Sequence, residues 1–181
     1  MNDSRLASRY AKALFGMARE HNLIDRVRLD LDKLTGLLAD SPEFKWLIQS
    51  PVINSTEKAR MIKTTLDGMI EPITLDFLQL LIHHRREANL PATCRMFMQL
   101  YKADQDILDA NVVSAYPVGA DFLDGLKKRL ETSSHKKIEM KTETNEALIG
   151  GFILTLEDQQ LDASVLSKLN RIRQELRESK K

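Results

Sequence analysis

The stretch of sequence that decides the fold lies near the carboxyl end, where residues 148–154 read LIGGFIL and residues 161–166 read LDASVL. The glycine pair Gly150-Gly151 precedes a short apolar segment, and glycines there favour a turn with positive φ or a bulge entering a strand. Asp162 and Ser164 directly precede apolar residues at helical spacing, where both side chains can cap a helix. We therefore predict a turn, a short strand, a tight turn and a capped final helix.

The segment before this stretch has the patterns of a small α/β domain. Residues 111–116 are apolar and β-branched and end at Pro117, which predicts a strand. Residues 137–144 alternate between charged and apolar or threonine side chains, the period of a half-buried strand. Between the two, residues from Asp121 onward have helical spacing. We predict a C-terminal α/β domain over residues 109–181, with a short sheet and a hairpin.

The first part of the chain is almost wholly helical in pattern, with apolar residues at three- and four-residue steps. Helix-start signals divide it into about six helices; at Ser41-Pro42 the serine caps and the proline takes the first helical position. The last helix is expected to extend to Leu108. Short connections favour an antiparallel bundle. We predict a mainly α protein, with an N-terminal six-helix bundle in residues 1–108 joined near residues 104–110 to the α/β domain.

The composition is that of a globular protein without a strong electrostatic field. Of the 181 residues, 43% are hydrophobic and 29% are charged, which argues against wholesale disorder. The formal net charge is +1, so no strong field recruits nucleic acid or an anionic membrane. No apolar run approaches the ~20 residues that a membrane span needs, and the start lacks the apolar run of a secretory signal. We expect no direct membrane insertion.

Residues that could carry chemistry have simpler structural explanations. His83 and Glu87 lie four apart and could share a metal on a continuous helix, but the two arginines between them would repel a cation. The single cysteine, Cys94, falls on an apolar helical stripe without an adjacent base, which favours an inert core thiol. The glycine pair lacks the lysine of a phosphate loop. We predict no catalytic residue, no metal site and no cofactor.

Two helices carry more apolar surface than one core contact needs. In the first helix, Tyr10, Ala13 and Leu14 lie on one stripe and a second apolar stripe runs beside it. The helix from Pro72 to His84 has the same excess. A helix at the centre of a bundle buries nearly all its sides, whereas a helix at a docking site leaves one stripe open to a partner helix. The residues alone leave both interpretations open.

Two motifs in the chain resemble the delta subunit of F-type ATP synthases, called the oligomycin-sensitivity-conferring protein in mitochondria. One is RYAKALF at residues 9–15, which is similar to the first-helix motif of that family. The other is the succession of glycine pair, strand, Asp162, small residue and Ser164. The resemblance covers most of the chain. The chain departs from the family at Arg85, where glycine is frequent, and at Glu157, where glycine often opens the hairpin turn.

The resemblance implies a mechanical, non-catalytic role as a peripheral-stalk (stator) subunit that clamps the catalytic head to the b-subunit stalk. In the family, the first and fifth helices form a groove for the helical N-terminal tail of an alpha subunit, and the C-terminal domain meets the C-terminal ends of the b subunits. The groove residues so implied are Tyr10, Ala13, Leu14, Leu80 and Leu81. The resemblance also implies one copy per complex, on the cytoplasmic side of a bacterial inner membrane or the equivalent side of an organelle membrane.

Three alternatives stay open on the residues alone. A helical nucleic-acid-binding protein would use the basic clusters at residues 127–129, 136–137 and 180–181 and would lose affinity steeply as salt rises, although aromatics total only 6%. A metal enzyme would use His83, His84 and Glu87. A generic adaptor would differ from a stator subunit only in the identity of its partners.

Overall fold

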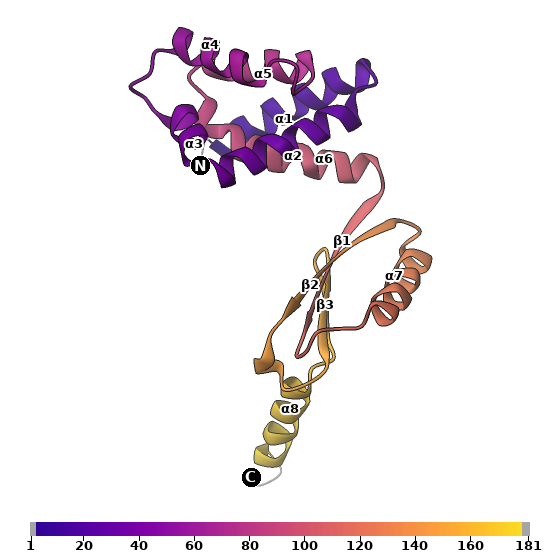
Figure 1. The fold of residues 1–181 in the computed structure, drawn as a ribbon. Coiled ribbons are helices and arrows are strands. Elements are labelled where there is room, and N and C mark those ends of the chain that lie inside the picture. The colour runs from indigo at the N-terminus through magenta and orange to yellow at the C-terminus, as the bar shows by residue number, and fades with distance from the viewer. Residues whose placement is uncertain (1–2, 179–181) are drawn as a thin grey trace. The chain divides into compact units, whose positions relative to one another are not determined.

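The computed structural model describes residues 3–178 (Figure 1). The chain separates into two compact units, Met1–Lys102 and Ala103–Lys181. Each unit has a hydrophobic core of its own. The described residues form a mainly helical structure with a small four-stranded sheet, so the predicted class is confirmed at this level.

The first unit consists of helices joined by short turns. Its elements are α1 (Asp3–Glu20), α2 (Ile24–Asp40), α3 (Pro42–Gln49), α4 (Ser55–Leu66), α5 (Pro72–His83), the 3-10 helix η1 (Glu87–Asn89) and α6 (Leu90–Asp104). The predicted start at Ser41-Pro42 is confirmed: the Ser41 hydroxyl accepts a hydrogen bond from the Phe44 N–H over 3.2 Å, and Pro42 is the first helical residue. Local sequence signals therefore fix where α3 begins.

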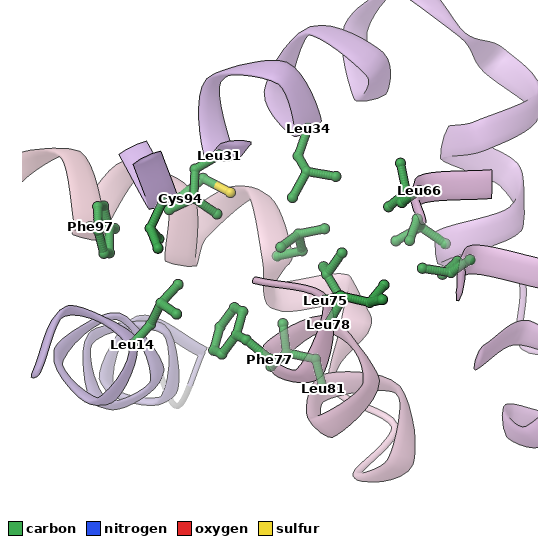
Figure 2. Close-up of a cluster of buried hydrophobic side chains, with 14 of the residues drawn as sticks. Leu14, Leu31, Leu34, Leu66, Leu75, Phe77, Leu78, Leu81, Cys94 and Phe97 are labelled. Carbon is green, nitrogen blue, oxygen red and sulfur yellow. The ribbon is translucent and has the colours of Figure 1, made fainter. Parts of the chain in front are cut away.

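All six α-helices of this unit contribute side chains to one core. A buried member from each helix, in chain order, is Leu14, Leu34, Phe44, Ile62, Phe77 and Phe97. Figure 2 shows several of these side chains together with Cys94. Cys94 is only 3% exposed, and burial raises the pKa of its thiol to about 11. A thiol of that kind is unreactive at neutral pH, in keeping with the predicted inert core role.

The end of α6 differs from the prediction. The helix stops at Asp104, the chain turns at Asp106 with φ of +51°, and Leu108 belongs to the strand that follows. Leu108 is buried in the core of the second unit, where it lies opposite Ile138. The prediction that the last helix extends to Leu108 is wrong, because the side chain packs in a sheet that the helical spacing did not reveal.

The second unit is a small α/β structure. Its elements are β1 (Ile107–Ser114), α7 (Ala120–Ser134), β2 (Lys137–Thr144), the 3-10 helix η2 (Glu146–Leu148), β3 (Phe152–Leu156), β4 (Gln159–Asp162) and α8 (Val165–Glu178). The strand order is β2-β1-β3-β4, with β1 parallel to β2 and antiparallel to β3. Leu108, Ala110 and Val112 of β1 pack with Leu126 and Leu130 of α7, so this helix covers one face of the sheet (Figure 1).

The glycine pair lies where the chain passes close to the start of α8. Gly151 has φ of +77°, and a Cβ atom there would lie 2.3 Å from the carbonyl oxygen of Ala163. A Cβ atom on Gly150 would lie 3.0 Å from the Cγ2 atom of Val165. Gly151 therefore satisfies two demands that only glycine meets, a left-handed backbone and a close backbone approach.

Two polar side chains organise the first turn of α8. The Asp162 carboxylate accepts hydrogen bonds from the Ser167 hydroxyl over 2.6 Å and from the Ser164 N–H over 2.8 Å. The bond from Ser167, followed by the bond from the Ser164 backbone, lowers the pKa of Asp162. The Ser164 hydroxyl oxygen accepts from the Ser167 N–H over 3.2 Å. Both side chains thus satisfy groups at the helix start, where capping residues act.

Candidate docking groove

A groove lies between the last turns of α1 and the exposed side of α5. Its cavity volume is about 570 Å³. The lining residues are Met17, His21, Leu23, Glu71, Pro72, Ile73, Asp76, Phe77 and Leu80. Six of these nine residues are apolar, and Glu71 and Asp76 are the two acidic ones. A concave apolar strip bounded by two helices has the form that accepts an amphipathic helix.

The sequence-predicted groove residues divide into three groups. Ala13 and Leu80 are exposed, and Leu80, 45% exposed, lines the groove. Tyr10 is half-buried and packs edge-on against Phe77. Leu14 and Leu81 are buried, at 0% and 1% exposure. The prediction that these two leucines contact a partner helix is therefore corrected: they face the core of their own unit and have no surface left to offer.

The structure also places in the groove residues that the prediction left out. Met17 lies one helical turn beyond Ala13, and Phe77 and Ile73 lie on α5 one and two turns before Leu80. Their apolar character was visible in the sequence as part of the same stripes. The motif at residues 9–15 drew attention to the middle of α1, whereas the groove lies at its carboxyl end. Extending the stripe by i+4 steps would have found Met17.

Two acidic residues border the groove. Glu71 pairs with Arg26 of α2, with 2.9 Å between the Oε1 and Nη1 atoms. Asp76 is exposed, and no cation of the described residues forms an ion pair with it. A second hollow of about 480 Å³, between α4 and α5, also includes Asp76 and Leu80 in its lining. The exposed ridge of α5 thus carries one unpaired carboxylate between two hollows.

The candidate metal pair is not assembled. The α5 helix ends at His83, so His83 and Glu87 do not share a continuous helix. The Glu87 carboxylate instead accepts a hydrogen bond from the Lys58 ammonium over 2.6 Å. Within residues 3–178 no three histidine, cysteine or acidic side chains are grouped as metal ligands would be. The metal-enzyme alternative therefore has no support in the arrangement of these side chains.

A second apolar surface lies on the second unit. Val165, Leu169 and Ile172 follow each other at helical spacing on α8 and are 38%, 43% and 52% exposed. Leu161 of β4 is also exposed, at 57%. These α8 residues form one face of an amphipathic helix, and the structure leaves that face uncovered by the described residues. Such a face is typical of a helix that packs against another chain.

The molecule thus has two compact units, each with an exposed apolar surface, and no helix within residues 3–178 is long and apolar enough to cross a membrane. Exposed apolar surfaces of this kind are typical of sites that bind other chains. The family model for the ATP synthase delta (OSCP) subunit matches residues 6–176. The chain belongs to this family, and the resemblance seen in the sequence is confirmed.

Curated relatives match over nearly the whole chain. The ATP synthase subunit delta of Rhizorhabdus wittichii is 34% identical over 166 residues, covering 91% of this chain and 90% of its own length. That of Moorella thermoacetica is 33% identical over 177 residues, covering 98% and 99%. A chain in the cryo-EM structure of the Toxoplasma gondii mitochondrial ATP synthase hexamer has the same fold, with a TM-score of 0.72 at 24% identity and coverage of 94% and 97%.

Proposed function

We propose that this delta-family subunit of the ATP synthase peripheral stalk acts as a mechanical clamp between the catalytic head and the stalk. Rotation of the central shaft drives ATP synthesis only if the head is held still. The observation that carries the proposal is the exposed apolar groove between α1 and α5 in a member of this family. The clamp transmits torque and has no catalytic step of its own.

The first unit binds the head in this proposal. Helices α1–α6 act as one six-helix bundle, supported by the core that all six share. The helical N-terminal tail of an alpha subunit lies in the groove, against Met17, Ile73 and Leu80. Ala13, with its small exposed side chain, lets the partner backbone come close at the groove's end. Leu14 and Leu81 contribute indirectly, because they pack α1 and α5 into the core of the unit.

The second unit binds the stalk. The exposed face of α8, with Val165, Leu169 and Ile172, is the surface against which the C-terminal ends of the b subunits pack. We place the boundary between the head-binding and stalk-binding domains after residue 102, where the two compact units divide. The subunit is present in one copy per complex and is peripheral, on the cytoplasmic side of a bacterial inner membrane or the equivalent side of an organelle membrane.

Such a clamp has to stay bound under load, which calls for nanomolar affinity or better, roughly 12 kcal/mol in total. Burial of apolar surface supplies most of this free energy and is not screened by salt. The affinity for the alpha tail is therefore expected to change little between low and high ionic strength. A nucleic-acid-binding protein would behave in the opposite way.

The test is a calorimetric titration of the full chain with the N-terminal peptide of the alpha subunit from the same synthase. Leu80→Glu and Ala13→Glu place a charge in or beside the groove and should weaken binding by about tenfold or more, the equivalent of about 1.4 kcal/mol. Leu29→Glu is the matched control, because Leu29 is 49% exposed on α2 and does not line the groove. Unchanged affinity in both groove variants would show that the alpha tail binds elsewhere.

The stalk contact is tested separately with the soluble C-terminal part of the b subunits. Leu169→Glu on α8 should abolish co-purification of this part and leave the alpha peptide titration unchanged. Lys168→Glu, at an exposed neighbour, controls for the introduced charge. Retention of the b subunits by Leu169→Glu would exclude the α8 face as their docking surface.

A further inference from the structure

Buried polar contacts hold the chain at both ends of α5, and we propose that they position this helix so that the groove exists before a partner arrives. The two contacts, made by Asp30 and by Lys58, are called here the end anchors of α5. The inference deepens the proposed function and rests on it, since it concerns how the groove for the alpha tail is kept in shape. It assigns roles to side chains that touch no partner.

The first anchor holds the start of α5. Asp30 belongs to α2 and is 3% exposed. Its Oδ2 atom accepts hydrogen bonds from the Glu71 N–H over 2.7 Å and from the Thr74 hydroxyl over 3.0 Å. Glu71, the N-cap residue of α5, makes no side-chain cap bond of its own. A carboxylate from another helix therefore caps α5, at the end where the helix dipole favours negative charge.

The second anchor holds the chain that leaves α5. Lys58 belongs to α4 and is 1% exposed. Its ammonium group donates to the carbonyl oxygens of Ile48 and Ser50 over 2.9 and 2.8 Å and to Glu87 over 2.6 Å. A lysine has three donors, so the group is fully satisfied. Because Glu87 opens η1, directly after the turn that ends α5, this contact joins that segment to the end of α3.

These contacts do something that the apolar core does not. Burial of apolar surface is non-directional, so it restricts the position of a helix less sharply than hydrogen bonds do. A buried hydrogen bond tolerates little change in distance or angle, and a buried polar group left without its partner is costly. Bonds at both ends therefore fix where α5 lies along α2 and which of its sides faces outward. The outward side is the one that carries Ile73 and Leu80 into the groove.

Neither anchor residue lines the groove, so both act through the position of α5. The link is shortest at Glu71: its N–H is bound by Asp30, and Glu71 itself lies at the groove border. Asp30 and Lys58 are therefore positioning residues. If α5 is displaced, part of the free energy of binding goes into restoring its position. The apparent affinity is then the intrinsic affinity multiplied by the fraction of molecules in which the groove is formed.

A matched pair of substitutions at Thr74, which is fully buried, separates positioning from stability. Thr74→Val keeps the volume and removes the bond to Asp30, whereas Thr74→Ser keeps the hydroxyl and removes a methyl group. In titrations of the full chain with the alpha N-terminal peptide, we expect Kd to rise about fivefold or more for Thr74→Val and to stay within about twofold for Thr74→Ser. The control is Thr64→Val, an exposed position on α4 whose hydroxyl bonds only its own helix.

If the bond to Asp30 had a purely structural role, both substitutions at Thr74 would lower the stability of the protein. The Kd for the peptide would then stay at the wild-type value as long as the variants are folded. Thr74→Val with the wild-type Kd would overturn the anchor proposal. A second measurement needs no partner: amide exchange in the first turn of α5 should be about tenfold faster in Thr74→Val than in Thr74→Ser. Equal exchange rates would also overturn it. If the wild type does not bind the peptide, the groove is not the site of the alpha tail. The amide exchange rates then test by themselves whether Asp30 positions α5.

Discussion

The ring of Tyr10 in α1 meets the ring of Phe77 in α5 edge-on, with 6.4 Å between centroids and 70° between ring planes. This contact joins the two helices that form the groove, and Phe77 also lines the groove itself. Tyr10 is half-buried and is not among the lining residues. It therefore contacts a lining residue of the groove, and the direct contact of Tyr10 with a partner, which the family resemblance implies, stays a prediction.

Tyr10→Ala is expected to lower the free energy of unfolding by about 2 kcal/mol. The substitution removes a half-buried ring, which costs less than removing a fully buried one, and it also removes the edge-on contact with Phe77. Tyr10→Phe keeps the ring and should retain most of the stability. Urea unfolding followed by circular dichroism measures both. Equal stability of Tyr10→Ala and the wild type would show that the ring contact is inconsequential.

Lys58→Met should destabilise the first unit by about 3–5 kcal/mol, because it leaves the Glu87 carboxylate buried without its cation. Lys63→Met, at an exposed position on the same helix, should change the free energy of unfolding by less than about 0.5 kcal/mol. Adding Glu87→Gln to Lys58→Met should recover part of the loss, since it removes the uncompensated charge. A loss no larger than that of Lys63→Met would mean that water replaces the ammonium group.

Arg85→Gly is expected to stabilise the chain by about 1 kcal/mol. Arg85 has φ of +54°, and in this conformation the N–H groups of Arg85 and Arg86 bond the carbonyl oxygens of Ile82 and Leu81. These two bonds are those that end a helix with a left-handed residue, usually glycine. Glu157→Gly, at φ of +51° in the β3–β4 turn, should act alike. Thermal unfolding of each variant measures the gain, and a lower midpoint for both would contradict the backbone argument.

The Cys94 thiol should make stability depend on pH in the alkaline range. Burial raises its pKa from 9.0 to about 11. The folded state thus keeps a proton that the unfolded chain releases, so the stabilisation is present below pH 9 and is lost as pH rises from 9 to 11. The loss attributable to this group is about 2–3 kcal/mol. The difference in unfolding free energy between wild type and Cys94→Ala, measured at pH 8 and pH 11, isolates it, and a constant difference would disprove it.

Features set by neighbouring residues were predictable from the sequence. The Ser41-Pro42 start of α3 rests on short-range geometry and appears where the residues place it. The strand at residues 137–144 follows from its alternation, and β2 has these bounds. The left-handed conformation at Arg85 was not predictable in this way, because arginine there carries no local signal: the turn is imposed by the packing of α5 and η1.

Features set by distant residues were not predictable. Leu14 of α1 and Leu80 of α5 both lie on helices with two apolar stripes, and the sequence does not reveal which stripe the rest of the chain covers. In the structure Leu14 is buried, whereas Leu80 lies in the groove. Lys58 lies in an amphipathic helix where lysine is ordinarily exposed. It is buried because the end of α3 and Glu87 converge on it, and that convergence exists only in the folded unit.

The strand order of the second unit has a consequence for synthesis on the ribosome. The central strand β1 pairs with β2 on one side and with β3 on the other, and β3 ends only at Leu156. During translation, β1 therefore keeps an unpaired edge until β3 has been synthesised, and unpaired strand edges favour aggregation. The helical unit needs no residue beyond Lys102 for its core, so it can fold first and leave only the nascent sheet for chaperones to shield.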